Sequence, residues 1–125
     1  MPTHVMVRSG VALDWNENDA GPAAPTVMDE DLYTNDVDVS GCDTFSVTFK
    51  HTTGTSPVGT IKLQTKNEDG TGYLDVPDSE VSVPISGLTH RWNVTNDGHR
   101  LVRLYYTFTS GTAVASASVN ARRNA

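Results

Sequence analysis

Four histidines and one cysteine are the residues of this chain best suited to bind a metal ion or to attack a substrate. None of the histidines has another histidine or a cysteine two or four residues away, so only the fold can gather them around zinc. They are His4, His51, His90 and His99. Cys42 has no second cysteine for an intrachain disulfide and no basic neighbour to activate its thiol. We expect all five residues to have structural or surface roles.

Carboxylates offer a second kind of chemistry. Asp29, Glu30 and Asp31 are consecutive, and oxygen ligands suit calcium, but their spacing matches no known calcium loop. Residues 67–70 are another oxygen-rich group, which a hairpin turn at Asp-Gly explains. Nothing selects a catalytic pair among the 15 acidic residues, and no nucleophile elbow, phosphate-binding loop or dinucleotide fingerprint is present. We therefore predict a protein that is not an enzyme and has no metal or cofactor.

Charge is unevenly distributed along the chain, whose formal net charge is −6. Residues 1–43 hold nine acidic residues and one basic residue, whereas residues 99–125 hold four arginines and no acidic residue. These arginines are Arg100, Arg103, Arg122 and Arg123. The two regions can attract each other within one subunit or between neighbours, or both can be solvated faces. The acidic balance and the lack of a basic patch with interleaved aromatic residues argue against nucleic-acid binding.

The clearest structural pattern lies in residues 99–123. From 102 to 108, apolar and polar residues alternate as in a half-buried strand, and after turn residues at 109–112 a second alternating run covers 113–120. This pattern predicts a β-hairpin, with its first arm as a central strand.

Similar alternation around Phe45, Leu63, Val83 and Trp92 is interrupted by turn residues, and residues 52–59 have the composition of a loop. Val and Thr are abundant, and no helical period is present. We predict an all-β fold, a jelly-roll-like β-sandwich of about eight to ten short antiparallel strands. The predicted core is Phe45, Val47, Phe49, Leu63, Val83, Ile85, Trp92, Val102, Leu104, Tyr106 and Phe108.

A length of 125 residues suits one domain. Residues 16–25 are rich in Pro, Asn and Asp, which indicates a loop. We therefore divide the chain into an N-terminal arm or edge segment at 1–26 and a β-sandwich domain at 27–125. No apolar run reaches the ~18 residues of a membrane span, and the N-terminus has no signal-peptide pattern. We expect a protein made in a cytoplasm, with no membrane partner.

Four motifs follow one another in about the last 80 residues. They are a Phe-x-Val-x-Phe strand at 45–49, a Gly-Thr-x-Lys-Leu-Gln run at 59–64, an Asn-x-Asp-Gly turn at 67–70 and a Tyr-rich strand with an arginine at 102–112. Their order resembles that of small virion proteins of tailed bacteriophages. The aromatic after the turn is Tyr73, where the resemblance leads us to expect tryptophan, and the acidic segment 16–43 has no counterpart.

The resemblance implies a capsid decoration or cement protein, commonly a homotrimer, that binds the major capsid protein on the outside of the head. An alternative is a glycan-binding module of a head fibre or tail receptor-binding protein, in which Trp15, Trp92 or Tyr105 stacks on sugar rings. A tail or neck component is a third possibility. The residues we expect to contact the capsid or a neighbouring subunit are Trp15, Asp29, Glu30, Asp31, Arg100, Arg103, Arg122 and Arg123.

Overall fold

The computed structural model describes residues 4–13, 26–28, 30–67 and 72–124, and in these residues it has one nine-stranded sheet and a single 3-10 helix. All described strand pairs are antiparallel, so the predicted all-β class is confirmed. The elements are β1 (His4–Leu13), β2 (Thr26–Met28), β3 (Leu32–Tyr33), β4 (Val37–Asp38), β5 (Thr44–Asn67), β6 (Leu74–Asp75), β7 (Val81–Val83), η1 (Ser86–Leu88), β8 (Thr89–Thr95) and β9 (His99–Asn124). In the described ranges, no helix has the length and apolarity needed to cross a membrane.

Two long strands, β5 and β9, organise the sheet, and they correct the prediction of uniformly short strands. They pair along almost their whole lengths, from Thr44 opposite Arg122 to Asn67 opposite His99. The predicted hairpin at 109–112 is wrong, because β9 continues through these residues and its two halves pair with β5 instead of with each other. The predicted loop at 52–59 is likewise part of β5.

The two misread segments lie opposite each other and form a bend. Thr55 pairs with Thr112 and Val58 with Ser110, and the register shifts on both sides of these pairs. Gly111 has a φ of 76°, and a Cβ at this position would collide with the main-chain oxygens of Thr55 and Ser56. The glycine therefore allows a change of direction inside a continuous strand, where the sequence pattern indicated a reversal.

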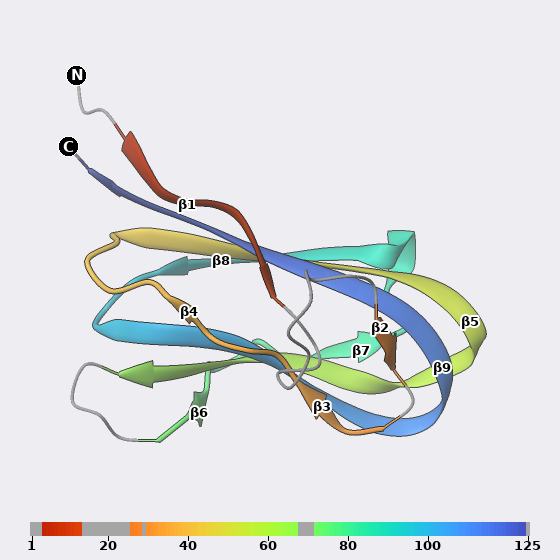
Figure 1. Ribbon diagram of the computed structural model, residues 1–125. Helices are drawn as coiled ribbons and strands as arrows, with labels where there is room; N and C mark the ends of the chain where they lie inside the picture. The colour runs from red at the N-terminus through yellow and green to blue at the C-terminus, as the bar shows by residue number, and fades with distance from the viewer. Residues whose placement is uncertain (1–3, 14–25, 29, 68–71, 125) are drawn as a thin grey trace.

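Because β5 and β9 bend together, the sheet curls over itself into two layers (Figure 1). The first layer contains β1 and β2, the second half of β9, the first half of β5, and β8. The second layer contains β3 and β4, the first half of β9, the second half of β5, and β6 and β7. Both termini of the described chain lie at the end of the molecule opposite the bend (Figure 1).

The core lies between the layers and confirms the predicted strand phase. All the predicted core residues are buried except Ile85 and Phe108, which are half-buried and pack against the core. The second half of β9 adds Ala115, Ala117 and Val119, small side chains that lie beside the inward-facing residues of β5 in the same layer. Period-two alternation thus identifies the buried side of each strand correctly, even where it misjudges the strand's length.

A buried serine links the two layers. Ser79, in the segment between β6 and β7, accepts a hydrogen bond at Oγ from the Leu63 main-chain N–H (3.1 Å) in the second layer. Its carbonyl accepts a bond from Trp92 Nε1 (2.8 Å) in the first layer. The indole N–H therefore has its hydrogen-bond partner inside the core. The glycan-binding alternative expected Trp92 to stack on a sugar ring, but Trp92 is buried and is not exposed for this role.

Candidate functional site

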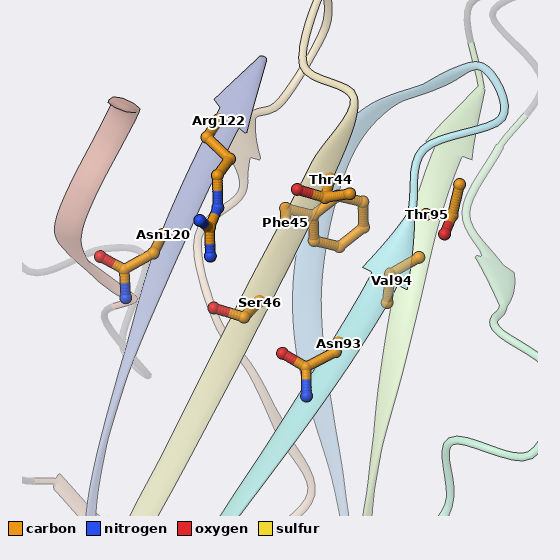
Figure 2. A pocket seen from close by; sticks show the side chains of 8 residues that line it. All are labelled: Thr44, Phe45, Ser46, Asn93, Val94, Thr95, Asn120 and Arg122. Atoms are coloured by element: carbon orange, nitrogen blue, oxygen red, sulfur yellow. The ribbon is translucent and has the colours of Figure 1, made fainter. Parts of the chain in front are cut away.

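A pocket of about 370 Å³ lies on the outer face of the first layer, where β9, β5 and β8 run side by side (Figure 2). Phe45 and Val47 point into the core, so the intervening positions of β5 point outward. The residues that line the pocket are Thr44, Phe45, Ser46, Asn93, Val94, Thr95, Asn120 and Arg122.

Strand register explains why these polar residues meet. Ser46 on β5 pairs with Asn93 on β8 and with Asn120 on β9, which gives a row of one hydroxyl between two amides. The next row places Thr44 between Thr95 and Arg122 in the same way. Residues from three strands therefore form one polar surface on a rigid sheet.

Several polar groups in the pocket have no partner among the residues that the structure describes. Among the described residues, the side chains of Ser46, Asn93 and Arg122 make no hydrogen bond or ion pair. Arg122 is also the single charged residue among the described residues that line the pocket. Figure 2 shows the Arg122 guanidinium directed along β9 toward the level of Asn120 and Ser46. The pocket thus offers a cation, amides and hydroxyls to a bound molecule.

The outer face of the second layer is different, because its polar groups bond to one another. Arg103 lies over the rings of Tyr33 and Tyr73, with its Cζ 4.5 Å and 3.8 Å from the two ring centroids. Its Nε donates to Gln64 Oε1 (2.9 Å), and Gln64 Nε2 donates to Asp75 (3.0 Å). We call these five residues the arginine–tyrosine network.

Two further contacts extend this network. Lys62 Nζ forms an ion pair with Asp75 (2.9 Å), and the Tyr73 hydroxyl donates to Asp36. The bonds from Gln64 and then Lys62 lower the pKa of the Asp75 carboxyl. Tyr105 lies on the same face, half-buried, with the Lys62 ammonium 5.6 Å from its ring centroid.

The predicted contact residues fall in different places. Arg122 lies in the pocket, whereas Arg103 is held in the arginine–tyrosine network. Asp31 accepts a hydrogen bond from the main-chain N–H of Phe108 (2.7 Å). Arg100 and Arg123 are exposed near the two ends of β9.

Glu30 is exposed as well, whereas Trp15 and Asp29 lie outside the described residues. No salt bridge joins the described acidic residues of the first third to these arginines. Their contacts with a neighbouring molecule stay a prediction.

Sequence reasoning did not identify Ser46, Asn93 and Asn120. Each is an ordinary polar residue on the outward side of a strand, and only the register of three strands places them in one row. Arg122 was selected for its charge alone. The useful signal was therefore partial: alternation showed which residues point outward but not which ones meet.

Metal ligands do not gather in the described ranges, where no group of three or more His, Cys, Asp and Glu side chains is close enough to hold an ion. His51 is buried, and its Nε2 accepts a hydrogen bond from the main-chain N–H of Ile85 (3.0 Å). Within the described chain its Nδ1 has no hydrogen-bond partner. Burial lowers the pKa of this imidazole.

No model of a protein family and no curated protein sequence matches the chain. Its fold is similar to that of solved structures, among them the enzymatically active domain of tailspike protein 4 from bacteriophage CBA120. The TM-score is 0.54 at 12% sequence identity over 96% of this chain. This chain spans 19% of the length of the tailspike chain. The likeness shows a shared β fold.

Proposed function

We propose that this chain is a non-enzymatic module of a bacteriophage virion that binds saccharides on the host surface. The observation that carries the proposal is the pocket in which the side chains of Ser46, Asn93 and Arg122 have no partner among the described residues. Fold likeness to a tailspike domain and the resemblance of the last 80 residues to phage virion proteins both favour a place in the particle.

The chemistry of the pocket suits a saccharide. Sugar hydroxyls both donate and accept hydrogen bonds, as do the Ser46 hydroxyl and the Asn93 amide. A volume of about 370 Å³ lies within the usual range of small-molecule sites. Because the side chains project from paired strands, their backbone is already ordered before a ligand binds.

The same lining argues for binding without catalysis. Glycoside hydrolysis generally needs two carboxyl groups on either side of the scissile bond. The described pocket residues include no Asp, Glu or His, and therefore offer Ser46 no general base. The tailspike domain is described as enzymatically active, and we do not extend that activity to this chain.

A glycan array followed by NMR titration tests the proposal. We expect selective binding to host-type saccharides, with shifts at Ser46 and Asn93, and about fivefold to tenfold weaker binding for Ser46→Ala or Asn93→Ala. Ser116→Ala is the matched control, because Ser116 lies on the same sheet face opposite Lys50 and outside the pocket. Binding to no saccharide on the array, or an equal loss of affinity in Ser116→Ala, would contradict saccharide binding in this pocket.

Capsid decoration is the second candidate, supported by the exposure of Glu30, Arg100 and Arg123, which leaves charged groups of both signs open to neighbours. In this role the chain is a homotrimer that binds the major capsid protein. Light scattering at low and high salt, followed by co-sedimentation with expanded empty heads, tests it. A monomer under all conditions that stays in the supernatant would exclude decoration and leave the receptor-binding role.

A further inference from the structure

Arg122 gives the pocket a chemical preference. The guanidinium has five N–H donors in a planar fork that matches the two oxygens of a carboxylate. Within the described chain it has no acidic partner, and the remaining lining residues are neutral. The pocket is thus a single positive point among neutral polar groups, on a protein whose formal net charge is −6.

We propose that the pocket selects an acidic sugar and that Arg122 binds its carboxylate; this inference rests on the proposed saccharide-binding function. The row formed by Asn93, Ser46 and Asn120 then faces the hydroxyls of the same sugar. The division follows from the register, because the charged row and the neutral row are adjacent across the same three strands.

A carboxylate fits these groups better than a phosphate-rich polymer does. Polyphosphate and nucleic-acid sites use several cationic groups or main-chain N–H groups to balance closely spaced charges. Arg122 is the single arginine among the described residues that line the pocket, and the net charge of −6 repels a dense polyanion. A sugar unit with one carboxylate and several neutral hydroxyls suits both the single arginine and the acidic net charge.

The test compares acidic sugars with matched neutral ones by calorimetric titration of the full chain. The pairs are sialyllactose against lactose, and trigalacturonate against its methyl ester. We expect one acidic member to bind at least tenfold more tightly than its neutral counterpart, with an affinity that falls as salt is raised. NMR shifts on the acidic ligand should centre on Arg122, Asn120 and Ser46.

Two variants and a control assign the preference to one side chain. Arg122→Gln should remove the acidic preference and leave the weak neutral binding, and Arg122→Lys should restore it only in part, because the ammonium lacks the planar fork. Arg123→Gln makes the same charge change at the adjacent exposed position outside the pocket lining, so it should keep the preference. A far-ultraviolet melt confirms that each variant folds.

The outcomes separate the inference from the function beneath it. If neutral and acidic members bind equally and Asn93→Ala weakens both, the acidic preference is overturned while saccharide binding stands. Equal loss in Arg122→Gln and Arg123→Gln overturns it as well, because the effect is then one of net charge. If no saccharide on the array binds, the proposed function falls and the inference falls with it.

Discussion

The two outer faces of the curled sheet hold similar kinds of polar residue but use them differently. On the second layer, Arg103 lies over the rings of two tyrosines and donates to Gln64, which in turn donates to Asp75. On the first layer, Arg122 and Asn93 are left without partners in the described chain, beside a pocket. An arginine that is satisfied by its own chain stabilises the fold, whereas an unpartnered one in a hollow is available to a ligand.

This difference follows from the side chains that the neighbouring strands place beside β5 and β9. In the second layer, short edge elements such as β3 and β6 place Tyr33 and Asp75 beside the long strands. In the first layer, β8 places Asn93 and Thr95 beside Ser46 and Thr44, and these short side chains leave a hollow next to Arg122. The size of the neighbours, more than the arginine itself, separates the face with the arginine–tyrosine network from the face with the pocket.

The largest expected effect comes from the core that both faces share. Leu104 is fully buried between the layers, so Leu104→Ala should lower the free energy of unfolding by about 2–5 kcal/mol. Both layers should unfold in one transition, measured by urea titration with tyrosine and tryptophan fluorescence. Val114→Ala, on the exposed side of the same strand, is the control and should cost far less. Two separate transitions would mean that the two layers unfold independently of each other.

The next effect comes from the bend that sets the two layers against each other. Gly111→Ala should cost about 1–3 kcal/mol, because alanine resists a positive φ and its Cβ meets the Thr55 and Ser56 oxygens. Gly41→Ala provides the comparison, since Gly41 has a similar φ of 75° but open space around its Cβ. Thermal melts of both variants should show the larger loss at Gly111. Equal losses would mean that the bend relaxes to admit a Cβ.

Much of the fold was predictable from local pattern. Alternation identified the all-β class and the inward side of the strands, because burial of one sheet face imposes period two. The bend was not predictable, because Thr-Ser-Gly-Thr suits both a reversal and a bend. The choice depends on whether residues 99–108 pair with 113–120 or with β5, and that is a long-range pairing.

The candidate site was less accessible to sequence reasoning than the fold. Charge alone pointed to Arg122 and Arg103 equally, yet one lines a pocket and the other lies over two tyrosines. What separates them is the identity of cross-strand neighbours from distant parts of the chain. Tyr33 and Tyr73, which occupy Arg103, are 40 positions apart in the sequence.

Lowering the pH should reduce the stability of the core and should leave the difference between the two outer faces unchanged. Burial lowers the folded-state pKa of His51, so the unfolded chain binds a proton more readily. Stability should be full above pH 6.5, the ordinary value, and should fall as pH drops from there toward the lowered folded pKa. Within this window the slope is at most about 1.4 kcal/mol per pH unit.

Urea unfolding across pH 4–8 checks the effect. His51→Phe should flatten the slope of stability against pH in this window, because phenylalanine binds no proton in the folded or the unfolded chain. The variant should also be less stable at pH 7, because the Ile85 N–H loses its acceptor. If His51→Phe retains the full slope, another group is responsible for the acid sensitivity.

The smallest change gives the most direct comparison of the two faces. Arg103→Gln removes the contacts with both tyrosines and the hydrogen bond to Gln64, and should cost about 1 kcal/mol of stability because the network is partly exposed to solvent. Arg122→Gln breaks no side-chain hydrogen bond or ion pair in the described chain, so its unfolding free energy should stay within about 0.5 kcal/mol of wild type. Ligand binding should change in the opposite order, with a large loss for Arg122→Gln and none for Arg103→Gln. Denaturation midpoints and saccharide titrations of the same two proteins measure both quantities. If Arg103→Gln were the variant that lost binding, the second layer would be the binding face, and the unpartnered groups of the first layer would be ordinary solvated residues.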